Sequence, residues 1–140
     1  MNNIVASPNT PIEKIVSIQT FETDGKLKLL RGYSGGGFQV NDEYISGSLI
    51  LYPREIHSCP ISDASQLSEE ILKPHVDAKK PDIVLIGVGT NPTHLYKPIR
   101  DYLKKCSIGV DIMSTSSACR TWNVLLSEGR QVISCLIAVP

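Results

Sequence analysis

The residues best suited to chemistry gather in one stretch near the end of the chain, MSTSSACRTWNVLLSEGR, at residues 113–130. Hydroxyl side chains at 114–117 precede Cys119 and Arg120 at the start of a helical pattern. The backbone N–H groups at a helix N-terminus attract anions, and a cysteine in the first turn beside an arginine can have a lowered pKa. The stretch therefore suggests an anion site or a reactive thiol at Cys119.

The same stretch also has a purely structural interpretation. One of the residues 115–117 can cap the helix by accepting a free backbone N–H, and Gly129 stands where a helix ends. Arg120 and Asn123 fall on the polar side of a helical wheel. The opposite arc is apolar and predicts the buried face: Ala118, Cys119, Trp122, Leu125 and Leu126.

A second polar segment, GVGTNP at residues 87–92, follows a nearly unbroken apolar run at 82–89. Ligands of open α/β sheets bind beyond the carboxyl ends of the strands. If 82–89 and 107–113 are neighbouring strands, their carboxyl ends would frame one crevice for a small molecule or anion. The residues of this candidate crevice are Gly87, Gly89, Thr90, Thr115, Ser116, Cys119, Arg120 and Asn123.

Other motifs carry weaker signals. The glycine-rich segment at 32–38 lacks the Gly-Lys-Ser/Thr ending of a phosphate loop, so a turn or bulge is favoured. His57 and Cys59 would share one face of a strand, as a Cys–His pair or by chance. Glu128 and Arg130 flank Gly129 and suggest an ion pair that fixes the turn. The remaining cysteines and histidines are scattered, so we expect neither a metal nor a cofactor.

Composition narrows the class of protein. Lys+Arg and Asp+Glu number 14 each among 140 residues, and this balance argues against a nucleic-acid binder. No apolar run approaches the roughly 20 residues of a membrane helix. The N-terminus lacks the pattern of a secretory signal. We therefore expect a cytoplasmic protein with reduced thiols and no membrane insertion.

The pattern along the chain predicts a flexible leader at 1–11 and a single α/β domain at 12–140. Strand composition at 14–21 is followed by a hairpin at 37–45 and an apolar strand at 46–53. The remainder alternates helices and strands, which favours parallel neighbours joined by crossovers. The first expected element is a helix at 67–76, with Ser68 as its N-cap and with Pro74 ending or bending it. It is followed by a strand at 82–89, a helix with Pro98 in its first turn, a strand at 107–113, the helix of the opening stretch, and a strand at 130–139.

Three segments resemble a known family: GYSGGGFQVNDEYISGSLILYP, IVLIGVGTN and DIMSTSSACRTWNVLLSEGRQV. The family is the small α/β family of uncharacterised Mth-type domain proteins, which includes a mitochondrial complex I assembly factor and the adipogenesis-associated protein. The family usually has Tyr at the position of Trp122. The resemblance implies a three-layer fold: a central, mostly parallel mixed sheet with one antiparallel strand, helices on one side, and an N-terminal β-hairpin layer with a helix on the other.

The resemblance brings no established reaction, and the sequence holds no complete catalytic constellation. We therefore expect a non-enzymatic accessory or assembly protein that acts through a protein partner. The alternative is a small-molecule or anion binder, or an enzyme, that uses the crevice. A redox-sensing thiol at Cys119 is a third hypothesis, and it requires an acidic thiol.

Overall fold

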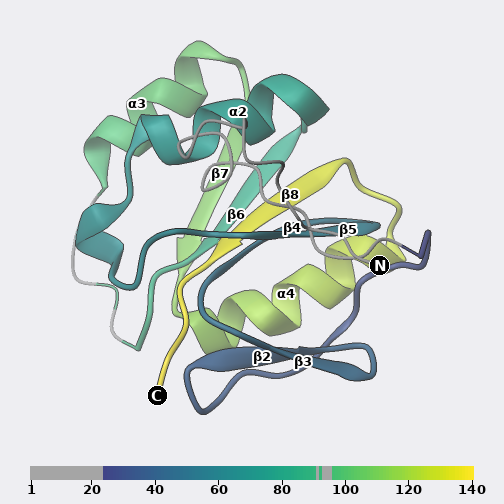
Figure 1. The fold of residues 1–140 in the computed structure, drawn as a ribbon. Coiled ribbons are helices and arrows are strands. Elements are labelled where there is room, and N and C mark those ends of the chain that lie inside the picture. The colour runs from purple at the N-terminus through teal and green to yellow at the C-terminus, as the bar shows by residue number, and fades with distance from the viewer. Residues whose placement is uncertain (1–23, 91, 93–95) are drawn as a thin grey trace, which may run out of the picture.

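The structure is a computed structural model in which residues 24–90, 92 and 96–140 are described. The leader predicted at 1–11 and the strand predicted at 14–21 lie outside these residues. The described chain is an α/β protein with two sheets and three α-helices, which confirms the predicted class (Figure 1).

The first sheet is small and antiparallel. It consists of β1 (Leu30–Gly32), β2 (Gly37–Val40) and β3 (Glu43–Ser46) in that order. β2 and β3 pair directly across Asn41 and Asp42, so the predicted hairpin is confirmed. Asn41 has a φ of 52°, a left-handed conformation that asparagine adopts more readily than most residues and that tight hairpins require.

The second sheet has five strands in the order β5-β4-β8-β6-β7. β6 pairs in parallel with both β8 and β7, whereas β4 is antiparallel to both β8 and β5. The sheet is therefore mixed, and β4 runs against the other four strands. The strands are β4 (Leu49–Tyr52), β5 (Glu55–Ser58), β6 (Ile83–Gly87), β7 (Gly109–Met113) and β8 (Val132–Leu136).

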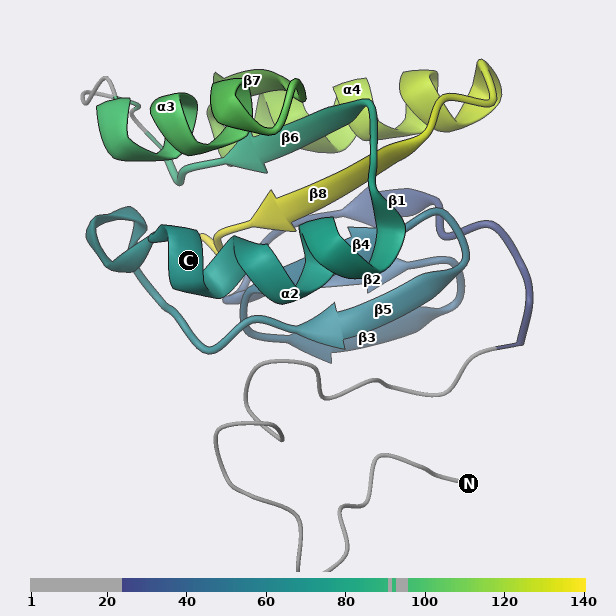
Figure 2. The same ribbon diagram turned by 90° about the horizontal axis from the view of Figure 1, so that it is seen from above.

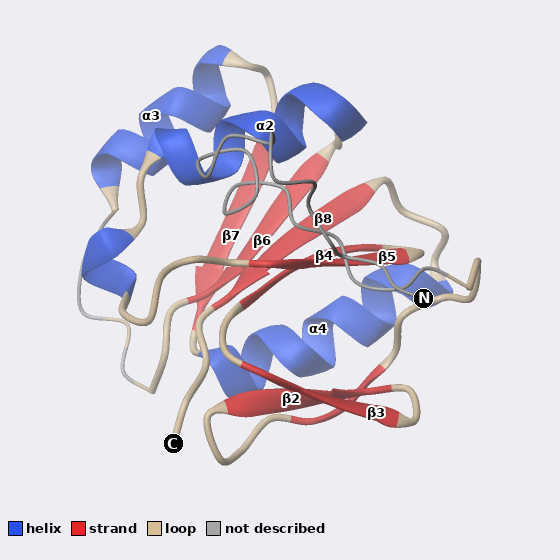
Figure 3. Ribbon diagram, in the orientation of Figure 1, coloured by secondary structure: helices blue, strands red, loops and turns tan. Residues whose placement is uncertain are grey.

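The helices cover both faces of the five-stranded sheet. α2 (Glu69–Lys79) and α3 (Lys97–Lys105) lie on one face, where α2 contacts β8 and α3 contacts β7. α4 (Thr115–Ser127) lies on the other face, between the five-stranded sheet and the small sheet (Figures 2 and 3). A short 3-10 helix, η1 (Ala64–Gln66), precedes α2.

Side-chain alternation along the central strands builds one hydrophobic cluster on each face of the five-stranded sheet. In β4, Ile50 joins the cluster under α2 and α3, whereas Leu49 and Leu51 join the cluster under α4. In β6, Val84 and Ile86 belong to the first cluster and Leu85 to the second. A strand covered on both faces reads as a continuous apolar run, as the sequence at 82–89 does.

Two neighbouring residues of α4 bind the backbone that enters the small sheet. The buried indole Nε1 of Trp122 donates to the Lys28 carbonyl at 2.7 Å. The Asn123 side chain accepts from the Leu30 N–H at 2.9 Å and donates to the Leu30 carbonyl at 2.8 Å. The Asn123 amide thus takes the place of a neighbouring strand. The helical wheel places Asn123 on the polar side of the helix, but its amide binds the backbone of β1 and does not simply face solvent.

The prediction that Pro74 ends or bends the helix near residue 76 is wrong in its end point. α2 continues to Lys79 with Pro74 in its interior. Pro74 cannot donate a bond to the carbonyl of Glu70, but buried residues on both sides of the proline, Leu72 and His75, hold the helix in place. Ser68 occupies the N-cap position as predicted, but its side chain makes no capping hydrogen bond.

The cap of α4 is one residue earlier than predicted. Ser114, and not a residue within 115–117, is the N-cap, and its side chain accepts from the Ser117 N–H. At the other end, Gly129 has a φ of 69° and its N–H donates to the Leu126 carbonyl, as predicted for a helix stop. The Arg130 N–H donates to Leu125, which completes a Schellman motif.

We expect Asn123→Ala to lower the free energy of unfolding by about 2–4 kcal/mol, because it leaves both the N–H and the carbonyl of Leu30 without their partner. Val124→Ala is the matched control on the next residue of the same helix, since Val124 is 54% exposed, and it should cost less than about 0.5 kcal/mol. Urea unfolding followed by circular dichroism measures both values. Equal stability of the two variants would contradict the role given to Asn123.

Candidate functional site

The predicted crevice is closed at its centre by Thr115. The side chain of Thr115 is fully buried, and its Oγ1 donates to the Ile137 carbonyl at 2.7 Å and accepts from the Gly89 N–H at 2.9 Å. The Thr115 N–H in turn donates to the Gly89 carbonyl at 2.8 Å. The hydroxyl is thus occupied in joining α4 to the segments that follow β6 and β8.

Gly87 lies where α4 packs most closely on the sheet. A Cβ at this position would be 3.0 Å from both the Ala118 Cβ and the Thr115 Cα, and 3.2 Å from a methyl group of Leu136. The glycine therefore allows helix and strand to touch and leaves no room for a ligand. Gly89 follows with a φ of 99°, a conformation that favours glycine.

The other predicted crevice residues do not converge on this point. Arg120 is exposed, and its Nη2 lies 3.4 Å from the Ser117 hydroxyl. The Ser116 hydroxyl lies 3.2 Å from that of Ser114, and Thr90 is exposed. Asn123, two turns further along α4, is occupied by Leu30. Side chains and hydrogen bonds thus fill the centre of the region, and the remaining residues are spread over its surface.

Cys119 is buried against the small-sheet side of the core. Burial raises the pKa of its thiol to about 12, and the nearby Arg120 opposes this only in part. The direction is opposite to that required for a reactive first-turn thiolate.

Glu128 and Arg130 form an exposed ion pair across the turn that leaves α4, with Oε1 and Nη1 3.6 Å apart. Exposed pairs of this kind contribute at most about 1 kcal/mol. The turn itself is held by the backbone bonds of the Schellman motif.

The structure brings together a group of ionisable side chains that the sequence reading missed. The Tyr52 hydroxyl lies 2.7 Å from Nδ1 of His75 on α2, and the ring of His57 lies 4.3 Å from the ring of Tyr52. Glu55 links His57 and Lys79, with distances of 3.1 Å to Nε2 and 3.5 Å to Nζ. Tyr52, Glu55 and His57 are close together in the sequence. Nothing in the sequence indicates that His75 and Lys79 of α2 complete the group.

Tyr52 and His75 share a buried hydrogen bond in this group. Burial, with a smaller contribution from the charge of Glu55, raises the pKa of Tyr52 to about 12. The phenol therefore keeps its proton near neutral pH, and its oxygen is hydrogen-bonded to Nδ1 of His75. A hollow of about 200 Å³ adjoins Tyr52, Glu55 and Lys79, but the Tyr52 hydroxyl is directed to His75. The group ties α2 to the β4–β5 hairpin.

Within the described ranges, no three His, Cys, Asp or Glu side chains are arranged to hold a metal ion. None of the helices in the described part of the chain has the length and apolar character needed to cross a bilayer.

Known proteins are similar to this chain over most of its length. A family described as "Protein of unknown function (DUF498/DUF598)" matches residues 30–137. The NADH dehydrogenase (ubiquinone) 1 alpha subcomplex assembly factor 3 of Drosophila melanogaster is 35% identical over 127 residues, covering 87% of this chain and 64% of the relative. The chain thus spans slightly less than two thirds of that protein's length. The 13 kDa major membrane protein of Francisella tularensis is 35% identical over 107 residues, covering 68% of this chain and 86% of the relative.

Solved structures share the fold. An outer membrane protein from Bartonella henselae is 31% identical, with a TM-score of 0.75, and the match covers 85% of this chain and all of that chain. A Mth938-like domain from Bordetella pertussis is 23% identical, with a TM-score of 0.68, over 80% of this chain and 86% of that chain. The second likeness concerns the fold alone.

We expect Gly87→Ala to lower the free energy of unfolding by about 1–3 kcal/mol, because the added methyl group overpacks the contact with Thr115 and Ala118. Gly109→Ala is the matched control on the neighbouring parallel strand, where an added Cβ has its closest neighbour at 3.4 Å. Its effect should be below about 1 kcal/mol. Thermal or urea unfolding of both variants measures the difference, and a tolerated Gly87→Ala would show that the helix can move away from the sheet.

The raised pKa of Cys119 predicts a pH-dependent stability. The folded state holds the thiol proton of Cys119 more tightly than the unfolded chain does. Its contribution to the free energy of unfolding is therefore intact below the ordinary thiol pKa of 9.0 and is lost as pH rises toward about 12. In the native protein at pH 8, iodoacetamide should label the exposed Cys106 well before Cys119. Peptide mapping by mass spectrometry measures both rates. Labelling of Cys119 at the rate of Cys106 would restore the reactive-thiol hypothesis.

Proposed function

The chain belongs to the DUF498/DUF598 family, and from this premise we propose that it is a non-enzymatic accessory protein that assists assembly through contacts with a protein partner. The observation that carries the proposal is its similarity, over 87% of its length, to a protein named as an assembly factor. Because the chain spans only 64% of that relative, the activity is proposed for this chain and not transferred with the name.

The interior of the molecule supports a role at the surface. Three of the predicted crevice residues serve contacts between helices and strands: Thr115, Gly87 and Asn123. The alternative, a small-molecule or anion site in the predicted crevice, would need Thr115 to give up bonds to two carbonyl or amide groups. We therefore place recognition on an exposed surface.

Exposed hydrophobic side chains favour the small sheet as that surface. Leu27, Tyr33 and Tyr44 are 39%, 37% and 48% exposed, and all come from the segment that forms this sheet and its connections. Aromatic side chains are enriched at protein interfaces. Tyr44 also donates to the carbonyls of Ser34 and Gly35, so Leu27 and Tyr33 are the better positions to change.

The proposed compartment is the cytoplasm, with the four cysteines as thiols. In the structure Cys59, Cys106, Cys119 and Cys135 are all free, which is the state expected in a reducing compartment.

We expect the double variant Leu27→Ser, Tyr33→Ser to reduce partner recovery at least tenfold, because truncation of interface anchors typically costs more than about 1 kcal/mol each. The tagged full chain is captured from an extract of the source cell and bound proteins are quantified by mass spectrometry. Val124→Ser is the control, since it removes a still more exposed hydrophobic side chain from α4, and it should leave recovery unchanged.

Arg120→Ala separates the two candidate functions. It changes the exposed charge of the predicted crevice and should leave partner recovery intact. Loss of the partner in Arg120→Ala but not in the double variant would contradict the surface proposed here. Recovery of no specific protein by the wild-type chain would count against the assembly role itself.

A further inference from the structure

A hollow of about 530 Å³ lies where the carboxyl ends of β5 and β8 meet the start of β4. Its wall includes Gly36 and Gly47, and a Cβ at either glycine would meet nothing within 4 Å. Ser48, Pro60 and Ile61 also line the hollow, and so does Cys59. Cys59 is therefore the one cysteine among the residues that line this largely apolar recess, beside Ser48 and Ser62.

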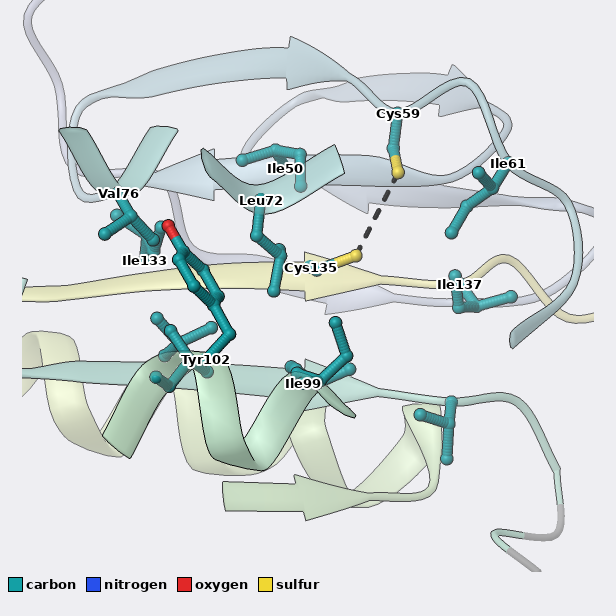
Figure 4. Close-up of a cluster of buried hydrophobic side chains, with 14 of the residues drawn as sticks. Ile50, Cys59, Ile61, Leu72, Val76, Ile99, Tyr102, Ile133, Cys135 and Ile137 are labelled. Atoms are coloured by element: carbon teal, nitrogen blue, oxygen red, sulfur yellow. Dashed lines mark hydrogen bonds between the residues drawn. The ribbon is translucent and has the colours of Figure 1, made fainter. Parts of the chain in front are cut away.

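Cys59 faces a second thiol. Its Sγ lies 3.9 Å from Sγ of Cys135, which projects from β8, and Figure 4 shows the two side chains directed toward each other. Cys59 is 7% exposed, whereas Cys135 is fully buried. The two sulfurs thus differ in access although they are in contact.

Negative charge in this pair is favoured on Cys59. The hydrogen bond from the Cys135 thiol lowers the pKa of Cys59 below its usual value, with a smaller contribution from the Ile61 N–H, and together they outweigh desolvation. The same hydrogen bond and complete burial raise the pKa of Cys135. When Cys59 is ionised, the Cys135 thiol is the group placed to donate to it.

The pair is poorly placed to form a disulfide with itself, because β4 lies between the two backbones. The Cys59 N–H donates to the Ser48 carbonyl on one edge of β4, and Cys135 is opposite Ile50 on the other edge. Backbones two strands apart are separated by roughly 9–10 Å, beyond the roughly 7 Å limit for a bridge without backbone movement.

We propose that Cys59 is a modification site at which small disulfides attach through the hollow, with Cys135 as a positioning residue that stabilises the Cys59 thiolate. The Cys59 thiolate attacks one sulfur of a low-molecular-weight disulfide. The new S–S bond forms as the old one breaks, and the other half of the reagent leaves as a thiolate that takes up a proton. No further oxidant is required, because the disulfide is itself reduced.

The test uses the native full chain carrying Cys106→Ser, which removes the one exposed cysteine. The probe is 4,4′-dithiodipyridine at pH 7, with thiopyridone release followed by absorbance and the adduct mapped by mass spectrometry of unreduced peptides. We expect one equivalent to react quickly and the adduct to lie on Cys59. Cys119 and Cys135 should react only as the protein unfolds.

Two variants at Cys135 test the positioning role. Cys135→Ala removes the donor and should slow Cys59 on the order of fivefold at pH 7, because a less stabilised thiolate is scarcer although more nucleophilic. Cys135→Ser keeps an O–H donor and should retain most of the rate. The deficit of Cys135→Ala should vanish above about pH 9.5, where an ordinary thiol is ionised, which a general loss of structure would not produce.

Several results would overturn the proposal. These are an adduct on Cys119 or Cys135 in place of Cys59, a Cys59 rate no faster than global unfolding, an unchanged rate at pH 7 in Cys135→Ala, or an internal Cys59–Cys135 disulfide as the main product. If Cys135→Ala does not fold, the pH dependence of the Cys59 rate in the Cys135→Ser protein decides, since a midpoint at or above the ordinary thiol pKa contradicts thiolate stabilisation.

Discussion

The hydrogen bonds from Trp122 and Asn123 to the backbone of Lys28 and Leu30 are the constraint on which the arrangement of the two sheets depends. α4 is covered by the five-stranded sheet on one side and by the small sheet on the other, so β1 has a helix where a strand could pair. Buried backbone groups must find partners. A side-chain amide can supply a donor and an acceptor together, and it does so here without breaking the helix.

This constraint explains why polar residues of α4 are structural. At the first residue of α4, the hydroxyl and the N–H of Thr115 both engage the segments that follow β6 and β8. These bonds occupy the centre of the predicted crevice, at the carboxyl end of β6. The hollow beside Cys59 lies further along the same sheet, near β5 and β8.

The sequence predicts the elements well where one local pattern determines them. The Asn-Asp link of the hairpin, the apolar run at 82–89, Pro98 at the start of α3 and Gly129 after α4 are each recognisable within about ten residues, and the structure contains all four features. Pro74 misleads because α2 continues through it, with buried residues on both sides of the proline. The cap of α4 is displaced by one residue because 114–117 offers four similar hydroxyls.

The candidate site could not be predicted in the same way, because it depends on partners distant in sequence. Asn123 meets Leu30 and Cys59 meets Cys135 across 93 and 76 positions, and no periodicity encodes either contact. The cysteines make the point in chemical terms. The sequence predicts a first-turn position for Cys119 beside an arginine, which would indicate a reactive thiol. In the structure α4 begins at Thr115, four residues before Cys119, and burial raises the pKa of Cys119 to about 12. Cys59 lies in an unremarkable loop context before Pro60, yet a second thiol and an open hollow give it the more favourable environment. The reactivity of a thiol follows from which groups can donate to it and whether a reagent can reach it, and both are properties of the folded chain.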